Sequence, residues 1–575
     1  MRKTALIILC LILFLATGFV LEKSRLSVPL RQNLQSKSVP SAVLNYGPTG
    51  KILKQLEVVQ AIKNDYSIFP ASPESDVDIN ATIFRKKRHV GEYLYKANPR
   101  GAKDMPSSVV IDEEELKKGW PVISITVGKD DLYSKERGII THYGSKGREW
   151  ERMAYVSYYE KGKLLFATSA GIRLHGNRPK PASCRLYFRK EYGTQQFKPG
   201  ILFSPETEPV RTLVVRISGF RTSLAYDISR RIGAAMPEYK LARFFFNNED
   251  KGIFSLTAHL SRRQWKAHLG HDNFIFYRYT SASDEESVKG HRKLKLWALD
   301  KRTKMTMKEA SKFIDIDNLS RHVFSNIFLG NTDWRQGVAF LDKSKAGAKW
   351  SWINWDMDHS FIDLAARRIG KRGEWTQEGI ELYTSGKTWV GPNPTIRRPL
   401  EKRDVRAIIF TRLLRESPEY RRYFVRLVMD LLNHRINPGF MQSRADYYDE
   451  KYRAFKIYKG LLDRLENKRR FMKFRPNFLR NQMQQHLGVG ESLACEVKGP
   501  VGIKYLIDNY PEKENYYGWY FKGEQIKVEI VSRQKASFLH WLVNGKNVRE
   551  HPLVYSVNSK TVIKPIFKRK DQGKS

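Results

Sequence analysis

Alternation of apolar and polar residues with a period of two marks the first ordered part of the chain. It is clear at 120–127, and a longer run after it predicts a hairpin that turns at residues 160–163. The same period returns at 211–218 and at 239–260, where two strands flank the turn 247–250. Because such alternation is typical of strands with one buried face, we expect a β-rich lobe to begin near residue 120.

The spacing of three to four residues that an amphipathic helix gives appears at 222–233, 317–330, 403–433 and 447–487. In the second of these helices Asp317 is expected to cap the N-terminus. Its predicted apolar face consists of Leu319, Val323, Ile327 and Phe328, and its predicted end is Gly330. This places the residues that follow Gly330 in a tight turn just past a helix.

From residue 488 onward the pattern changes to short alternating runs separated by Gly, Asn and Pro. These runs predict a small all-β accessory domain at 488–575, arranged as a sandwich. Residues 23–119 show only weak patterns, and we interpret them as a stalk and loosely ordered lead-in. Since 120–487 mixes strands with helices, the expected fold class is α+β, followed by the all-β domain.

The composition is that of a folded protein with an unusual charge. Among 575 residues, 41% are hydrophobic and 12% are aromatic, which speaks against general disorder, yet the formal net charge is +42. Lys and Arg are spread through the whole length, so we expect the basic surface on the folded domains themselves. Such a charge implies an anionic partner, and nucleic acid is the usual first candidate.

The N-terminal segment argues against a nucleic-acid partner. Arg2 and Lys3 precede an uncharged apolar stretch at residues 4–21, as in an export signal or a membrane anchor. The stretch is near the lower limit of about 18 residues for a membrane-spanning helix. No clear cleavage site follows, and polar residues begin at Glu22, so the pattern favours an uncleaved anchor at 1–22 over a cleaved signal peptide. Either segment places the body of the protein outside the cytoplasm.

The cysteines and histidines limit the kinds of metal site. The three cysteines are Cys10, Cys184 and Cys495, which excludes a disulfide scaffold. Too few Cys and His residues cluster for a zinc site. Any metal is therefore expected to be a hard cation bound by oxygen atoms.

Three aspartates gather among tryptophans and aliphatic residues between residues 330 and 361: Asp333, Asp356 and Asp358. On an extended strand, Asp356 and Asp358 would project to the same face, about 6 to 7 Å apart. At an effective dielectric constant near 20, such a pair repels by about 2 to 3 kcal/mol. A metal ion, arginines or protons would offset this repulsion. A helix cap for one aspartate and an arginine partner for the other would satisfy the same spacing.

Several separated motifs resemble those of the CotH family of atypical protein kinases. The most specific are "GNTDW" at 330–334 and "WDMDHSF" at 355–361. The resemblance spans 120–487 and includes, in the same order, "REWERMAYVSYYEKGKLLFATSAGIRLHGN", "LAYDISRRIG" and "RLLRESPEYRRYFVRLVMDLLN". It implies a two-lobed, kinase-like fold that uses ATP with Mg²⁺ or Mn²⁺ to phosphorylate Ser or Thr on secreted or surface proteins.

The resemblance also implies roles for individual residues. Asp333 looks like the catalytic aspartate that orients the acceptor hydroxyl. Asp356 looks like the metal-binding aspartate, with Asp358 as a second ligand. The nucleotide phosphates are then expected near the loop "RLHGN". The residues expected to contact the nucleotide are Arg173, Gly176, Asn177 and Arg185.

This chain departs from the family pattern at three places. Val338 stands where relatives carry an Asn that holds a second metal ion, and Ala258 stands where an acidic residue is expected. The strand entry "PASCRL" lacks the usual lysine. These departures leave open a second function, a catalytically weakened scaffold that binds a cell-envelope polymer or a surface assembly. Basic runs at 367–375 and 467–476 are typical either of solvated surface or of binding to such an anionic polymer or to phospholipid.

Overall fold

The computed structural model describes the backbone of two short segments, 66–70 and 81–85, and most of the chain from Trp120 to Lys568. The described ranges in that part are 120–161, 163–176, 183–193, 200–203, 209–217, 220–247, 249–331, 333, 336–361, 379–380, 404–454, 459–531 and 537–568. The chain divides into two compact units. The barrel unit comprises Met1–Ile217 with Glu238–His268, and the helical unit comprises Ser218–Pro237 with Leu269–Ser575.

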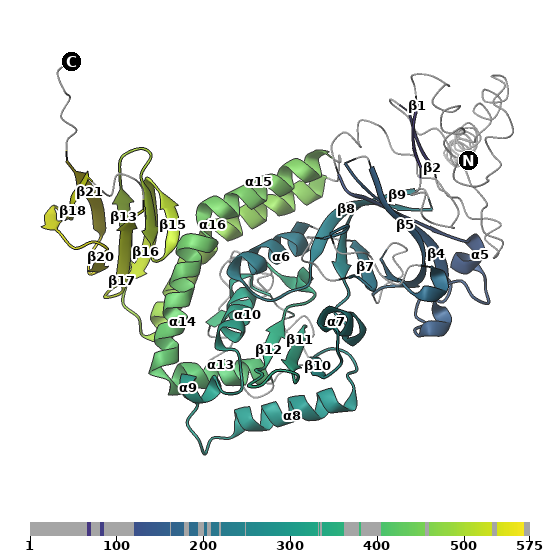
Figure 1. Cartoon of the computed structure of the whole chain (residues 1–575), viewed down its shortest axis with the longest axis horizontal. Coiled ribbons are helices and arrows are strands. Elements are labelled where there is room, and N and C mark those ends of the chain that lie inside the picture. Colours follow the sequence, from purple (N-terminus) through teal and green to yellow (C-terminus); the bar gives the residue numbers. More distant parts are fainter. Residues whose placement is uncertain are drawn as a thin grey trace, which may run out of the picture. The chain divides into compact units, whose positions relative to one another are not determined.

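The barrel unit contains a closed barrel of seven strands in the order β3-β4-β5-β6-β7-β9-β8 (Figure 1). The strands are β3 (Val122–Val127), β4 (Arg152–Glu160), β5 (Lys163–Leu174), β6 (Cys184–Tyr187), β7 (Thr212–Ile217), β8 (Tyr239–Phe246) and β9 (Glu249–Ala258). Closure comes from β3, which pairs in parallel with β8, whereas the other neighbours are antiparallel. The hairpins predicted at 160–163 and 247–250 are confirmed as β4–β5 and β8–β9.

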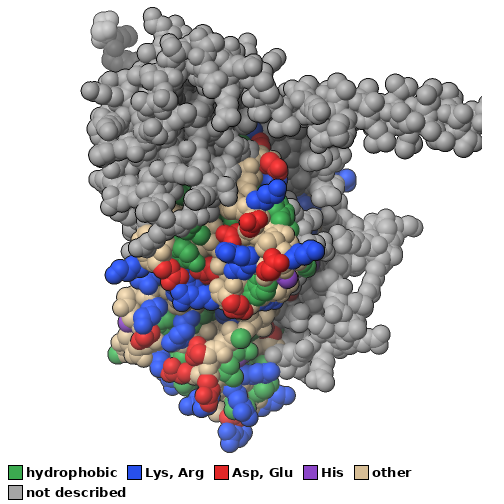
Figure 2. Space-filling view, turned by 90° about the vertical axis from the view of Figure 1, so that its right-hand side faces the viewer, with side chains coloured by type: hydrophobic (Ala, Val, Ile, Leu, Met, Phe, Trp, Pro, Cys, Tyr) green, Lys and Arg blue, Asp and Glu red, His purple; other side chains and the backbone are tan. Residues whose placement is uncertain are grey.

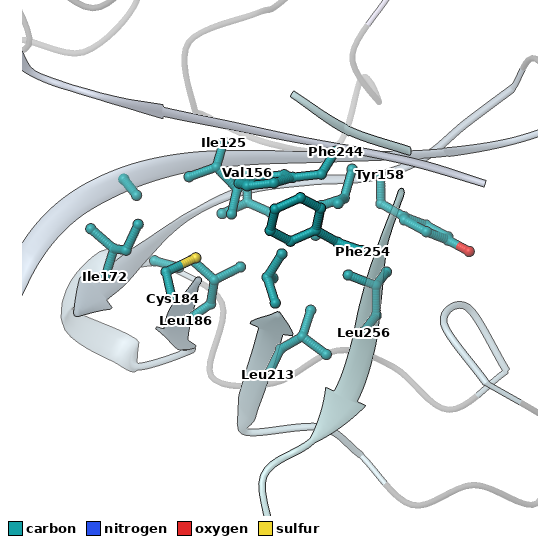
Figure 3. Packing of buried hydrophobic residues seen from close by; sticks show 14 of the residues in the cluster. Ile125, Val156, Tyr158, Ile172, Cys184, Leu186, Leu213, Phe244, Phe254 and Leu256 are labelled. Carbon is teal, nitrogen blue, oxygen red and sulfur yellow. The ribbon is translucent and has the colours of Figure 1, made fainter. Parts of the chain in front are cut away.

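One apolar core fills the barrel, because alternate residues of each strand point inward. Figure 3 shows side chains from several strands packed against one another. The residues of this core include Ile125, Val156, Ile172, Leu186, Leu213, Phe244, Phe254 and Leu256. Among the described residues, the unit also includes two short α-helices, α5 (Lys129–Tyr133) and α7 (Arg262–Leu269). Within 23–119, interpreted from sequence as a lead-in, β1 (Tyr66–Pro70) and β2 (Ala81–Arg85) form an antiparallel pair.

The helical unit begins with α6 (Phe220–Ile232), the helix predicted at 222–233. Its apolar residues Leu224, Ile228 and Ile232 are fully buried. Further helical elements among the described residues include α8 (Glu285–Leu299), α9 (Met307–Ala310), α10 (Ile316–Phe328), α13 (Val405–Glu416), α14 (Pro418–Asp430), the π-helical turn η7 (Leu431–Arg435), α15 (Pro438–Ala454) and α16 (Lys459–Leu487). They accompany a three-stranded sheet of β10 (Phe274–Arg278), β11 (Val338–Asp342) and β12 (Ser351–Ile353). The expected α+β class is therefore confirmed.

The predicted cap of α10 was wrong by two residues. Asp315 caps this helix and accepts a hydrogen bond from the backbone N–H of Asn318 at 2.9 Å. Asp317 lies within the first turn of α10 and forms an ion pair with Arg321 at 2.6 Å. Both aspartates stand near the helix N-terminus, so sequence alone did not distinguish the cap from the first turn. The predicted region 403–433 is divided at Ser417, whose hydroxyl caps α14.

Residues 492–567 form two further sheets, which Figure 1 shows in yellow tones. The five-stranded sheet has the order β16-β13-β21-β18-β19, and the four-stranded sheet has the order β15-β14-β17-β20. The strands are β13 (Ser492–Lys498), β14 (Lys504–Ile507), β15 (Tyr510–Lys513), β16 (Asn515–Phe521), β17 (Gln525–Ile530), β18 (Phe538–Val543), β19 (Lys546–Val548), β20 (Leu553–Ser556) and β21 (Thr561–Phe567). The expected strand content is thus present, while an independent domain at 488–575 stays a prediction.

A buried polar cluster joins the end of α14 to the turn between β14 and β15. Arg426 contacts both Asp508, at 2.7 Å, and Asp430, at 3.0 Å. His434 in η7 lies 3.5 Å from Asp508 and 2.9 Å from Glu512. Burial raises the pKa of Asp430 to about 6, against the opposing charge of Arg426. Stability at this joint is therefore linked to pH.

Replacing Asp430 with asparagine is expected to remove one pH-dependent part of the stability. Because the raised pKa lies above that of the unfolded carboxyl, the wild type gains stability at low pH and loses it as the pH rises from about 4 through about 6. A shift of this size corresponds to about 3 kcal/mol. Between pH 4 and pH 7, the free energy of unfolding of Asp430→Asn, measured in urea, should rise relative to that of the wild type by up to that amount. If the stability difference between the variant and the wild type is the same at both pH values, the raised pKa of Asp430 is contradicted.

Positive and negative side chains are mixed on the part of the described surface that Figure 2 shows. Figure 2 shows one face of the molecule, where Lys and Arg side chains are interspersed with Asp and Glu side chains. Within the described residues, no helix combines the length and the apolar composition needed to span a membrane. The anchor predicted at 1–22 and the basic run at 367–375 lie outside the described residues.

Candidate functional site

The first of the three aspartates follows the end of α10. This helix closes with a Schellman motif, in which the N–H of Gly330 donates to the carbonyl of Ile327 at 3.2 Å and the N–H of Asn331 donates to that of Asn326 at 3.0 Å. Gly330 has a φ of 57°, a conformation that glycine adopts without strain. The sequence "GN" after an apolar helix therefore sets the direction in which the chain leaves α10.

Asp333 lies half-buried in the turn that follows, as predicted. Its backbone N–H donates to Oδ1 of Asn331 at 3.1 Å. Its own carboxylate oxygen Oδ2 accepts from the side-chain amide of Gln336 at 3.1 Å. We call residues 330–337, apart from 332, 334 and 335, which lie outside the described residues, the first aspartate turn. The carboxylate of Asp333 is thus oriented by a neighbour within the same turn.

A network of buried amide side chains supports this turn. Asn331 donates from Nδ2 to Oδ1 of Asn326 at 2.8 Å, and Asn326 donates to Oδ1 of Asn354 at 3.0 Å. Asn354 in turn donates to the hydroxyl of Ser325 at 2.9 Å. Each of these four residues is at most 4% exposed. Buried amides must be hydrogen-bonded, so each member fixes the position of the next. Our reading of the sequence did not identify these residues.

Asp356 and Asp358 do not lie on a strand, contrary to the prediction. β12 ends at Ile353, and Asp356 has a left-handed backbone conformation with φ 56° and ψ 57°. Asp358 lies in the single 3₁₀ turn η4 (Met357–His359). The apparent alternation arose because Met357 is buried beneath this turn. Aspartate tolerates the left-handed conformation better than most residues, so the chain reverses here.

The second aspartate turn, residues 354–361, is held against α6 and α10. Nη1 of Arg221 on α6 donates to the backbone carbonyl of Asp358 at 3.2 Å. Asn331 contacts the sulfur atom of Met357 at 3.5 Å, and Asn354 belongs to the amide network. The two aspartate turns are therefore adjacent and share the same buried support.

Two basic residues of the run 467–476 bind backbone carbonyls at the end of α10 and in the second aspartate turn. Arg475 is fully buried in α16 and donates from Nε to the carbonyl of Phe328, in the last turn of α10, at 3.0 Å. Lys468 is 2% exposed and donates to the carbonyl of Phe361 at 3.1 Å. The expectation of a solvated or polymer-binding run was wrong for these two residues. They bind backbone carbonyls that the end of a helix and a turn leave without partners.

A buried ion pair also contacts the first aspartate turn. Arg406 has no exposed surface and makes a bidentate contact with Asp404, at 2.9 and 2.7 Å. Its Nη1 donates to the backbone carbonyl of Gln336 at 3.2 Å, and its guanidinium lies 4.0 Å from the ring centre of Tyr279. Since Gln336 orients Asp333, Arg406 acts on the catalytic candidate through one intermediate residue.

His322 completes this cluster as a neutral side chain. Burial, together with the charge of Arg406, holds the pKa of His322 well below its usual value. Its Nε2 lies 3.1 Å from Nη1 of Arg406. Arginine only donates hydrogen bonds, so Nε2 is the acceptor and the ring proton resides on Nδ1. A protonated imidazole at this position would repel Arg406, which excludes His322 as a proton shuttle near neutral pH.

The two substituted family positions are apolar and packed. Val338 opens β11, is 1% exposed and stands opposite Ile353 of β12. Ala258 ends β9 and packs against the barrel core. Neither side chain has an oxygen or nitrogen atom, so neither provides the ligand or the ion pair that the family resemblance implies at its position.

The cationic residues predicted to meet the nucleotide make contacts within the barrel. Arg173 forms an ion pair with Glu151 at 3.3 Å, and its guanidinium lies 4.0 Å from the ring centre of Tyr187. Arg185, opposite Arg173 in the β5–β6 register, donates from Nε to Nδ1 of His175 at 2.8 Å. Gly176 is exposed with a φ of 99°, which agrees with a role that needs glycine. Asn177 lies outside the described residues.

The family resemblance predicts Asp356 and Asp358 as metal ligands and Asp333 as the catalytic aspartate. Within the described residues, which include all three, no three His, Cys, Asp or Glu side chains lie close enough together to bind one ion. Mg²⁺ bound with a nucleotide commonly takes one or two carboxylates and completes its shell with phosphate oxygens and water. Asp356 and Asp358, two hard oxygen donors in one turn, fit that pattern, and their role as ligands stays a prediction.

The candidate site lies in a part of the chain that matches a known family model. Residues 217–459 match the family model described as CotH kinase protein. The matched range contains both aspartate turns, the amide network and the Asp404–Arg406 pair, and it lies inside the range 120–487 predicted from the motifs. No curated protein sequence matches the chain.

Proposed function

Since residues 217–459 belong to the CotH kinase protein family, we propose that this chain transfers the terminal phosphate of ATP to Ser or Thr hydroxyls of secreted or surface proteins. The observation that supports this most is the shared support of the two aspartate turns by Asn331 and Asn354. Phosphoryl transfer needs a carboxylate at the incoming hydroxyl and carboxylates for the metal, held in fixed relation to each other.

In this mechanism Asp333 accepts a hydrogen bond from the acceptor hydroxyl and orients its oxygen toward the phosphorus atom. Gln336 holds one oxygen of this carboxylate and thereby limits its rotation. Asp356 and Asp358 would hold Mg²⁺ or Mn²⁺, with Arg221 fixing the backbone at Asp358. When bound, the metal ion supplies neutralisation of the charge that develops on the phosphate oxygens.

The test is phosphate transfer by the purified full chain. The protein is incubated with ATP labelled in the terminal phosphate, Mn²⁺ and acidic or Ser-rich acceptor proteins. Incorporation is expected for the wild type and for the control Asp317→Ala, whose aspartate pairs with Arg321 on α10. Asp356→Ala should lose it. Wild-type incorporation no higher than that of Asp356→Ala would end the proposal.

A second function is a catalytically weakened scaffold that binds an anionic envelope polymer or a surface assembly. Val338, buried at the position of the second metal ligand, favours it. Thermal unfolding separates the two functions, because ATP with Mn²⁺ stabilises a nucleotide-binding protein by about 2.7 kcal/mol at 100 times its Kd. A scaffold without a nucleotide site should show no such gain.

We further propose that the protein works outside the cytoplasm, attached to the membrane by residues 1–22. The charge pattern of that segment supports this placement. Cell fractionation tests it: the chain should remain with the membrane fraction in high salt, and a chain that begins at Lys23 should not. Recovery of the intact chain with cytoplasmic proteins would contradict the proposed location. A nucleic-acid partner would then again be a candidate.

A further inference from the structure

An acidic side chain is buried on the outer face of the barrel between two arginines. Glu151, just before β4, lies over Gly171 of β5, where any larger side chain would collide with its carboxylate. Arg189 binds this carboxylate through Nε and Nη2, at 2.8 and 3.2 Å. Arg173 also forms an ion pair with it, at 3.3 Å. Burial, with the charge of Glu151, raises the pKa of Tyr192 to about 12. Arg189 and Arg173 together already offset the single negative charge of Glu151.

Two more arginines lie at the same end of the strands. Arg211 directly precedes β7, and its backbone N–H donates to Oε1 of Gln264 on α7 at 2.8 Å. Arg263, the neighbour of Gln264, donates from Nη2 to the carbonyl of Phe188 at 3.1 Å. Because Phe188 follows β6 directly and bonds to the carbonyl of Arg211, α7, β6 and β7 meet here.

These arginines have buried donor atoms without partners. Within the described part of the chain, Nε of Arg211 and Nη1 of Arg263 are shielded from solvent and make no hydrogen bond. Burial, followed by the charges of Arg189 and Arg211, lowers the pKa of Arg263. Unsatisfied buried donors are rare in folded proteins, and an anion bound between these two side chains would satisfy both of them.

We propose that Arg189, Arg211 and Arg263 form a binding site for a phosphate-class dianion in the barrel unit. Glu151 and Glu191 both contact Arg189, and Arg173 contacts Glu151, so Arg173, Arg189, Arg211 and Arg263 together exceed these two carboxylates by two positive charges. Planar guanidinium groups bind tetrahedral oxyanions through paired N–H donors, whereas a metal ion finds no suitable ligand among them.

This site differs from the loop predicted to meet the nucleotide phosphates. That loop, at Gly176, connects the end of β5 to the start of β6, whereas Arg189 and Arg211 lie beyond the end of β6 and before the start of β7. Strands β6 and β7 are antiparallel, so both arginines are at the opposite end of β6 from the loop. The anion site therefore does not depend on the proposed kinase activity.

Inorganic phosphate is the probe, titrated into the full chain by calorimetry without nucleotide or divalent metal at constant ionic strength. The wild type should bind phosphate more tightly than acetate. Arg263→Gln and, independently, Arg211→Gln should weaken phosphate binding by about tenfold or more, since each removes a charge-assisted contact. Arg302→Gln, which changes an exposed arginine paired with Asp300, should bind as the wild type does.

The two substitutions lie on different elements, so a folding defect of one variant, seen by circular dichroism, still leaves the other as the test. O-phosphoserine in place of phosphate distinguishes a site for phosphate esters from one for the free ion, and both outcomes require the same loss in Arg263→Gln. Absence of phosphate binding by the wild type would overturn the proposal. So would wild-type affinity in both arginine variants.

Discussion

Replacing Asp404 with alanine is expected to lower the free energy of unfolding by about 3 to 5 kcal/mol, because it leaves a buried guanidinium without its counter-ion. Arg406 has no exposed surface, and its other contacts include the neutral His322, the backbone carbonyl of Gln336 and the ring of Tyr279. Asp404 also caps α13 by accepting from the N–H of Arg406 at 2.9 Å. Neither Gln336 nor Tyr279 supplies the lost negative charge. Urea unfolding, followed by circular dichroism, measures the difference.

The double variant Asp404→Ala with Arg406→Met distinguishes the stability that the ion pair provides from the stability that the helix cap provides. It removes both charges, so it should recover much of the lost stability and leave mainly the cost of the missing cap, about 1 kcal/mol. Glu285→Ala is the control, since it breaks an exposed ion pair with Lys289 on α8 and should change stability little. A double variant as unstable as Asp404→Ala would show that the ion pair is not the cause.

Replacing Asp333 with asparagine is expected to reduce the rate of phosphate transfer by about 100-fold or more, the usual contribution of a positioned carboxylate. The asparagine keeps the shape of the side chain and an oxygen acceptor for Gln336, but it lacks the negative charge that favours a hydrogen bond from the acceptor hydroxyl. Initial rates at varied ATP concentration should show the loss in kcat, with KM for ATP nearly unchanged.

Folding of the Asp333→Asn variant provides the matched check. Asp333 is half-buried in a turn, and the amide network beneath it does not involve its carboxylate, so the melting temperature should remain near that of the wild type. A loss of activity that follows the melting temperature would indicate a structural role only. Undiminished kcat in a folded variant would remove Asp333 from the catalytic role.

The sequence was sufficient for elements whose pattern is local. The β4–β5 hairpin follows from apolar runs on both sides of a short turn, and the end of α10 follows from an apolar helix closed by Gly330. The family motifs located both aspartate turns without any structure. Each of these signals depends on neighbours within a few residues, which is the range over which hydrophobic periodicity and turn preference act.

The sequence was insufficient where distant residues decide the conformation. The alternation of apolar Met357 with its polar neighbours predicts a strand at Asp356. Met357 is instead buried because it packs beneath a turn, not because it lies in a sheet. Lys468 and Arg475 resembled surface charges, and only their contacts with carbonyls more than 100 residues away show why they are buried. The amide network is missed for the same reason, since Asn326 and Asn354 meet only after α10 and β12 have packed.

The most direct measurement for the proposed kinase is the position of Mn²⁺ in a crystal grown with a non-hydrolysable ATP analogue, read from anomalous diffraction. A peak about 2.0 to 2.2 Å from a carboxylate oxygen of Asp356, bridged to the analogue's phosphates, is the result we expect. A bound analogue whose Mn²⁺ contacts neither Asp356 nor Asp358 would contradict the proposed role of the aspartate turns.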